Sequence, residues 1–389
     1  MHLSVDDPST PRAPLGARIV GREALPALRE SWTRLVAAMG RPSPFSSWEW
    51  HTAWSETLGR ECDLTIVLVE EGARVVGILP FASGGAVARP RHRGRVLEFG
   101  AFARAHPDQL EPIAAPAEEA AVLRCALGAL AHRGGFDCLR FPLASETAAL
   151  PGRLASCGGG WQLRERVTSA APYAVLAPRF EQFLAGTSSN ERYKIHSRTR
   201  KLLARPGVAY GDLSARSAAE NFAVLRRLHG ARAQEKGIVS SFDEEGVQEF
   251  HLRFLALYPQ EAVMFRGLCV AGEPFAVFYG FRAGGRVLYF QLGYDPEWSK
   301  SSPGLVLLSE VIRESCEAGC AEFDFLQGSE PYKRTWARTE RRLLELQLFA
   351  PTLRGRVCCE LDRVAGRLRD AMLVRRALSA SGATGRGSR

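Results

Sequence analysis

One succession of predicted elements occurs twice in this chain, about 200 residues apart, and it limits the possible folds more than any other feature. The apolar alternation of the first half predicts a hairpin, a third strand, a helix and a fourth strand, at residues 64–81, 95–99, 117–132 and 136–141. The same four elements return in the same order at residues 263–282, 286–293, 303–318 and 321–326. Because this period is far too long for a solenoid, we predict two tandem copies of one unit.

The predicted fold class is α/β in the α+β sense, with a mixed, mainly antiparallel sheet flanked by helices in each unit. We divide the chain into a disordered N-terminus at 1–16, a first unit at 17–175, a second unit at 176–350 and a basic helical tail at 351–389. The candidate chemical motifs lie in the second unit. We therefore expect the site there, and we expect the first unit to be a degenerate partner that shapes the acceptor cleft.

Several classes of protein are excluded by what the sequence lacks. It has no run of eighteen apolar residues, so we expect no transmembrane segment, and its polar N-terminus does not resemble a signal peptide. The nine cysteines form no metal-binding pattern, so we expect no metal and reduced thiols in a cytoplasm. No zinc-protease, nucleophile-elbow, P-loop or dinucleotide-binding motif is present.

The net charge of +9 is concentrated in two places. Residues 190–205 hold six basic residues against one acid, and the tail after residue 351 holds nine arginines against three acids. Such surfaces suit coenzyme A, RNA, phosphorylated intermediates or a membrane face. The alternative is that both segments are ordinary solvated helix faces.

The start of the predicted helix at 303–318 is a candidate anion site. Pro303 is tolerated in the first turn of a helix, and Ser301 or Ser302 is placed to cap it. Free amides at a helix start attract phosphate. The groups that we expect to bind a diphosphate are Lys300, Ser301, Ser302, Gly304 and Leu305. The alternative is an ordinary capped helix.

A cluster of acidic, aromatic and basic residues follows the next strand. Asp324 lies in an otherwise apolar strand, so it must be paired with a base such as Lys333 or Arg232, or be functional. Beyond it, Glu330 is a candidate acceptor of a proton from an amine, and Tyr332 is a candidate donor to a departing thiolate. Lys333 is a candidate ligand of an anionic substrate. A surface turn packed by aromatic residues is the alternative.

His229 and Arg232 lie one turn apart on a predicted helix and therefore share a face. Either they contact substrate, or His229 is an ordinary structural histidine.

These motifs resemble one known family. The runs LHGARAQEKG, GYDPEWSKSSPGLVLL and FDFLQGSEPYKRTW, within residues 183–349, resemble the BioF2-like (CelD/BcsL-type) acetyltransferase domain of the GNAT superfamily. That group is similar in fold to the FemAB aminoacyltransferases, which contain two tandem GNAT units. The positions that match the family's turn are Gly293, Tyr294, Ser302, Pro303 and Gly304. The positions that match its terminal motif and its His-x-x-Arg element are Asp324, Gly328, Glu330, Tyr332, Lys333, His229 and Arg232.

The resemblance implies an acyltransferase that uses acetyl-CoA or another acyl-CoA as co-substrate, without a metal and without a covalent enzyme intermediate. We expect Asp324, Glu330 and Tyr332 to be catalytic and Gly293 to join the diphosphate-binding groups. We expect His229, Arg232, Tyr294 and Lys333 to bind substrate. The predicted acceptor is an amine or hydroxyl of a small molecule or saccharide, from envelope, polysaccharide or natural-product synthesis in the cytoplasm.

Two alternatives remain open. One is FemAB-like transfer from aminoacyl-tRNA, in which the basic segments contact RNA. The other is a non-catalytic docking module of a polysaccharide-synthesis system, with peripheral membrane contact through the basic tail.

Overall fold

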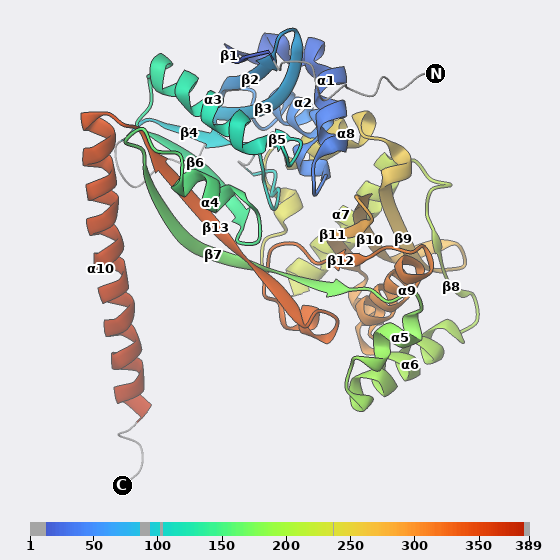
Figure 1. The fold of residues 1–389 in the computed structure, drawn as a ribbon. Helices are drawn as coiled ribbons and strands as arrows, with labels where there is room; N and C mark the ends of the chain where they lie inside the picture. The colour runs from blue at the N-terminus through green and yellow to red at the C-terminus, as the bar shows by residue number, and fades with distance from the viewer. Residues whose placement is uncertain (1–12, 86–93, 102–103, 236, 385–389) are drawn as a thin grey trace.

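The computed structural model describes residues 13–85, 94–101, 104–235 and 237–384. Within these ranges, thirteen strands form a single sheet (Figure 1). The strands are β1 (Leu15–Val20), β2 (Asp63–Glu71), β3 (Arg74–Ser83), β4 (Val96–Phe99), β5 (Ile113–Ala114), β6 (Cys138–Ser145), β7 (Gln162–Val175), β8 (Val208–Asp212), β9 (Val263–Val270), β10 (Glu273–Ala283), β11 (Arg286–Tyr294), β12 (Glu322–Asp324) and β13 (Thr339–Phe349). The helices are α1 (Leu25–Ala38), α2 (Trp48–Glu56), α3 (Glu119–Arg133), α4 (Leu150–Ala155), α5 (Phe180–Ala185), α6 (Ser189–Leu203), α7 (Ala218–Glu235), α8 (Val247–Leu257), α9 (Pro303–Glu317) and α10 (Leu353–Thr384).

The order of the strands across the sheet confirms the predicted fold class and the repeat. The order is β1-β2-β3-β4-β6-β13-β7-β12-β11-β10-β9-β8, with β5 attached to β3. It reads the same from both edges: an antiparallel edge strand, β1 or β8, then a hairpin, a third strand and a strand parallel to the third. A helix, α3 or α9, connects the two parallel strands in each copy, as a parallel pair requires.

The centre of the sheet differs from the prediction. We expected the strand at 341–349 to close the second unit, but β13 lies between β6 and β7 and pairs with both. The strand expected at 161–167 continues to Val175, and its far end pairs with β12. The last strand of each copy therefore lies beside the sheet of the other copy. This exchange depends on contacts between distant segments, which local sequence patterns do not encode.

The N-terminus differs in one detail. We expected disorder to residue 16, but β1 begins at Leu15, where it pairs with Glu71 of β2. The part of that expectation at residues 1–12 lies outside the described residues.

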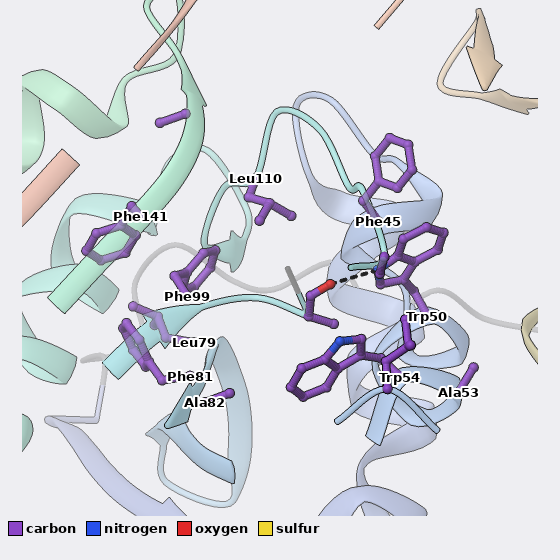
Figure 2. Packing of buried hydrophobic residues seen from close by; sticks show 14 of the residues in the cluster. Phe45, Trp50, Ala53, Trp54, Leu79, Phe81, Ala82, Phe99, Leu110 and Phe141 are labelled. Carbon is purple, nitrogen blue, oxygen red and sulfur yellow. Dashed lines mark hydrogen bonds between the residues drawn. The ribbon is translucent and has the colours of Figure 1, made fainter. Parts of the chain in front are cut away.

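The two copies share one hydrophobic core. Trp50 of α2 is fully buried, and its ring centroid lies 4.8 Å from that of Phe250 and 5.0 Å from that of Phe254, both on α8. Figure 2 shows Trp50 beside Phe45 and Trp54 on the first copy's helices. Because this core crosses residue 175, the copies pack as one body.

A second core cluster holds helix α9 against the sheet. Val306, Leu307, Val311 and Ile312 of α9 are fully buried against the strands of the second copy. Together with Leu308, which is 2% exposed, they recur at spacings of three and four residues, which explains both the amphipathic helix and its docking on the sheet. The start of α9 is therefore held at a fixed place beside β11.

Helix α10 stands at the margin of the molecule (Figure 1). Cys358 and Cys359 pack its first turns against Val96, Cys138 and Phe349. In the part of the chain that the structure describes, no helix is long and apolar enough to cross a membrane.

Candidate active site

The strands β11 and β12 separate beside the start of α9. They pair only from Arg286 to Leu288, and β11 then follows β10 as far as Tyr294. The chain after β12 instead follows β7, since the amide of Phe325 donates to the carbonyl of Pro172 at 2.9 Å. The second half of β11 therefore has no partner strand on the side of β12. The backbone groups of that edge are available to a ligand.

A cavity of about 270 Å³ lies at this separation. Six of the predicted site residues line it: Arg232, Tyr294, Ser302, Gly304, Leu305 and Tyr332. They come from α7, the end of β11, the start of α9 and the short helix Pro331–Thr335. The fold therefore brings together residues that are up to 100 positions apart in the sequence.

The start of α9 is not capped as predicted. Ser302 has φ 56°, ψ 50°, in the left-handed region, and its side chain makes no capping hydrogen bond. A capping serine needs an extended conformation to aim its hydroxyl at the next amides, so the predicted cap was wrong. Pro303 has no N–H, and the amides of Gly304 and Leu305 lie beyond the reach of intrahelical partners. These two amides are left for a ligand in the cavity.

Arg232 is the cationic group among the described residues that line the cavity. Its guanidinium carbon lies 4.7 Å from the centroid of the Tyr294 ring, and its Nε is buried without a hydrogen-bond partner. Among the described residues, no carboxylate lies within ion-pair distance of Arg232. An unpaired guanidinium in a cavity is unfavourable unless an anion completes it.

Two tyrosines lie across the cavity from α9. The Tyr332 hydroxyl donates to the Tyr289 hydroxyl at 3.1 Å. Burial raises the pKa of Tyr332 to about 12 and that of Tyr289 well above its ordinary value. Both hydroxyls therefore keep their protons at neutral pH, and Tyr332 is in the form that can donate one.

Gly293 does not line the cavity. A Cβ at this position would lie 2.7 Å from the backbone nitrogen of His229 and 3.1 Å from the carbonyl oxygen of Leu225. The glycine thus permits close packing of α7 on β11, which holds Arg232 in place.

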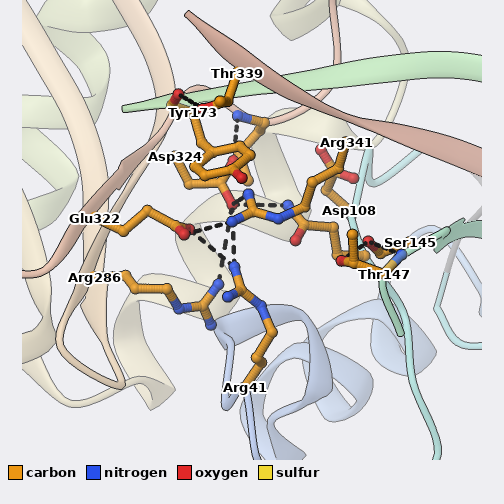
Figure 3. Close-up of polar contacts among 12 residues, drawn as sticks. Arg41, Asp108, Ser145, Thr147, Tyr173, Arg286, Glu322, Asp324, Thr339 and Arg341 are labelled. Carbon is orange, nitrogen blue, oxygen red and sulfur yellow. Dashed lines mark hydrogen bonds and ion pairs between the residues drawn. The ribbon is translucent and has the colours of Figure 1, made fainter. Parts of the chain in front are cut away.

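Asp324 is fully buried in a network of arginines outside the cavity (Figure 3). Its carboxylate lies 3.2 Å from Arg341, 3.8 Å from Arg41 and 3.9 Å from Arg286. Gln109 of the first copy also donates to it at 2.9 Å. The partners that we predicted, Lys333 and Arg232, were wrong, because arginines of three other segments surround this strand end.

Lys333 holds a loop in the structure. It is 3% exposed, its Nζ lies 3.0 Å from a carboxylate oxygen of Glu330, and it donates to the carbonyl oxygen of Gln327 at 2.8 Å. Burial lowers the pKa of Lys333. Neither Lys333 nor Glu330 lines the cavity, although both flank Tyr332 in the sequence.

The other predicted residues lie around the cavity. Nδ1 of His229 lies 2.8 Å from the hydroxyl of Ser240, and burial lowers the pKa of this histidine. Lys300 is exposed, and its carbonyl oxygen accepts a hydrogen bond from Arg198 of α6 at 3.2 Å. The basic helix α6 thus reaches the segment that leads into α9.

Sequence reasoning missed Tyr289, Trp336 and Ser299, which also line the cavity. Tyr289 lies in a strand of apolar residues and is typical of a core position, so only its pairing with Tyr332 identifies it. The partners of Asp324 were also missed, because Arg41 and Gln109 lie more than 200 positions away in the sequence.

Comparisons with known proteins identify one family and several similar folds. Residues 189–334 match the family described as acetyltransferase (GNAT) domain. A search of curated protein sequences found no match. The structure resembles FemX with a TM-score of 0.60 and 9% identity, over 82% of this chain and 95% of FemX.

Two further solved structures are similar. The C-terminal domain of a putative lysylphosphatidylglycerol synthetase from Agrobacterium fabrum has a TM-score of 0.55 and 11% identity, over 88% of this chain and 96% of that one. A conserved protein of unknown function from Bacteroides thetaiotaomicron has a TM-score of 0.53 and 11% identity, over 86% and 100%. These likenesses concern the fold. Residues 189–334 therefore carry the features of an acetyltransferase (GNAT) domain, and the chain is a transferase built on the fold that FemX shares.

Proposed function

We propose that the chain transfers an acetyl or other acyl group from acyl-CoA to an amine or hydroxyl, in the cavity between β11 and the start of α9. One observation carries this proposal: an unpaired arginine, two free helix amides and a buried tyrosine pair line the same cavity. A volume of about 270 Å³ suits the thioester end of such a donor, since it is close to the smaller ligand cavities of proteins.

The anionic part of the donor has two sets of contacts in this proposal. The amides of Gly304 and Leu305 bind the diphosphate, and the helix dipole of α9 adds to the attraction. Arg232 supplies positive charge to the diphosphate, and it is the one cationic side chain among the described residues that line the cavity. Lys300 and the exposed Arg198 of α6 lie beside the mouth and suit a further phosphate.

The acceptor attacks the carbonyl carbon of the thioester directly. A nitrogen–carbon or oxygen–carbon bond forms, the carbon–sulfur bond breaks, and the sulfur leaves as a thiolate. Tyr332 turns its hydroxyl to this thiolate and gives it the proton, and the Tyr289 hydroxyl then donates to the phenolate oxygen that remains on Tyr332. The proton that the acceptor loses passes to water, because Glu330 pairs with Lys333 and does not line the cavity.

The buried ionic residues have a supporting role in this scheme. Asp324 and Lys333 do not line the cavity, so we assign them to holding the loop that carries Tyr332 rather than to the chemical step. His229 supports Arg232 from the preceding turn of α7. This assignment replaces a direct catalytic role for Asp324 with a positional one.

The first copy is assigned no donor site. The corresponding helix, α3, begins with Glu118 and Glu119, and Glu119 pairs with Arg153. Two carboxylates at a helix start disfavour a phosphate there. We therefore propose that residues 17–175 form the degenerate unit, and that its loop around Gln109 borders the acceptor side of the second unit, residues 176–350.

Aminoacyl transfer from tRNA is the second candidate. The resemblance in fold to FemX and the exposed basic face of α6 favour it. Acyl-CoA is preferred because the matched family is described as an acetyltransferase domain. That match also disfavours the non-catalytic docking module. The acceptor proposed is a small molecule or saccharide in the cytoplasm.

Calorimetric titration with acetyl-CoA tests the proposal. Arg232→Gln should weaken binding by about 10- to 100-fold, because a charge-assisted hydrogen bond is lost. Arg227→Gln is the matched control, since Arg227 lies on the same helix, is exposed and does not line the cavity. Equal affinity of both variants would contradict the role of Arg232, and binding of aminoacyl-tRNA without acetyl-CoA binding would favour the second candidate.

A further inference from the structure

Helix α10 carries a line of exposed aliphatic side chains. These are Leu353, Val357, Leu361, Val364 and Leu368, with exposed fractions between 51% and 82%. Their spacing of three or four residues places them along one side of the helix. We call this line the α10 stripe. A single exposed aliphatic residue is common on protein surfaces, but a continuous row of them indicates an interaction surface.

The α10 stripe faces away from the rest of the chain. Gly355, Cys359 and Asp362 lie on the opposite side of the helix, at their own spacing of three and four residues. Cys359 is 1% exposed, and Asp362 lies 3.1 Å from Arg164 of β7. The helix is therefore docked by one side and presents the other to its surroundings at the margin of the molecule (Figure 1).

Arginines flank the stripe. Arg354 lies on one border, and Arg356, Arg363 and Arg367 lie on the other. The two nearby acids are already occupied: Glu360 pairs with Arg363 at 2.6 Å, and Asp362 pairs with Arg164. In the described portion of the chain, Arg356 and Arg367 have no carboxylate within ion-pair distance. Arg354 pairs with Asp137 at 3.2 Å, so the surface offers an aliphatic line with uncompensated positive charge along one border, at Arg356 and Arg367.

We propose that the α10 stripe binds an anionic lipid membrane, with the aliphatic side chains in the acyl boundary and the arginines among the headgroups. Positive flanks beside an aliphatic line are the combination that peripheral helices use at such surfaces. This attachment is independent of the transfer reaction, because no residue of the stripe lines the cavity.

Pairing with a second copy fits less well. A symmetric interface would place the same arginines opposite one another, and like charges repel. Charge therefore favours the membrane.

Sedimentation of the full chain with lipid vesicles tests the proposal. The chain should bind vesicles rich in phosphatidylglycerol and not vesicles of phosphatidylcholine alone, and added salt should weaken the binding. The double variant Leu361→Gln, Val364→Gln should lose binding by on the order of tenfold or more, because two aliphatic groups no longer leave water. Arg356→Gln with Arg367→Gln should reduce the preference for the anionic lipid.

The matched control is Val167→Gln with Val175→Gln, which changes two valines of β7 that are 53% and 68% exposed. It should bind as the unchanged chain does. Equal vesicle binding by the stripe variant would overturn the proposal, as would equal binding to both lipids. A dimer in light scattering that the stripe variant converts to a monomer, without vesicle binding by the unchanged chain, would assign the surface to a second copy instead.

Discussion

Replacement of Asp324 by asparagine separates a positional role from a chemical one. The carboxylate is 0% exposed, and it faces Arg341 at 3.2 Å, Arg41 at 3.8 Å and Arg286 at 3.9 Å. Removal of one partner from a buried ionic group costs about 3–5 kcal/mol. Glu322 still pairs with Arg341 and Arg41, which offsets part of this cost. We therefore expect Asp324→Asn to lower the free energy of unfolding by about 3 kcal/mol.

Urea unfolding followed by circular dichroism measures this effect. With an m-value of about 3 kcal/mol per molar urea, the midpoint should fall by roughly 1 M. Glu340→Gln removes an exposed carboxylate next to Arg341 in β13 and should change the unfolding free energy by less than about 0.5 kcal/mol. If Asp324→Asn kept the midpoint of the unchanged chain and lost acyl transfer, Asp324 would act in the chemical step and the reasoning would be refuted.

Three further predictions follow from the site and its supports. Tyr332→Phe should lower kcat by about 10²- to 10⁴-fold with little change in KM, because the proton donor is lost; an unchanged kcat in steady-state assays would exclude this role. Burial raises the pKa of Asp108 from 3.8 to about 8, so the folded chain holds this proton more tightly, and stability falls as pH rises from about 4 to about 8. Asp108→Asn should therefore gain stability relative to the unchanged chain as pH rises, and equal urea midpoints at about pH 5 and about pH 8.5 for both chains would contradict this cause. Gly293→Ala should destabilise the chain by about 1–3 kcal/mol, because its Cβ would crowd the nitrogen of His229; a thermal melt identical to that of the unchanged chain would show that α7 can move.

The repeated unit was predictable because each of its strands and helices has a pattern of residues that are close together in the sequence. Alternation of apolar residues and positive-φ glycines at the hairpin turns, such as Gly72 and Gly272, define the two hairpins directly. The helix at α9 follows from its apolar residues at spacings of three and four. These patterns involve residues that are close together in the chain, so they can be recognised from the sequence alone.

The exchange of β7 and β13 could not be predicted in the same way. The outer residues of β7, from Glu165 to Thr168, are exposed and polar apart from Val167, which is typical of an edge or a loop. What makes this segment a central strand is its pairing with β13, whose residues come almost 180 positions later. Backbone pairing of this kind is specified by the whole fold.

The site was predictable in part. Arg232, Tyr294, Gly304 and Tyr332 were selected from the sequence, and the structure places them around one cavity. The environment of Asp324 was not predictable, since its arginines come from segments that only the folded chain brings together. The conformation of Ser302 was also hidden, because a left-handed φ at a serine has no local signature.

A crystal structure of the chain with a non-hydrolysable acyl-CoA analogue is the most direct test of the central claim. We predict that the diphosphate lies within hydrogen-bond distance of the amides of Gly304 and Leu305, with the thioester position facing the Tyr332 hydroxyl. Density for the analogue at the start of α3, or with its diphosphate away from α9, would contradict the account.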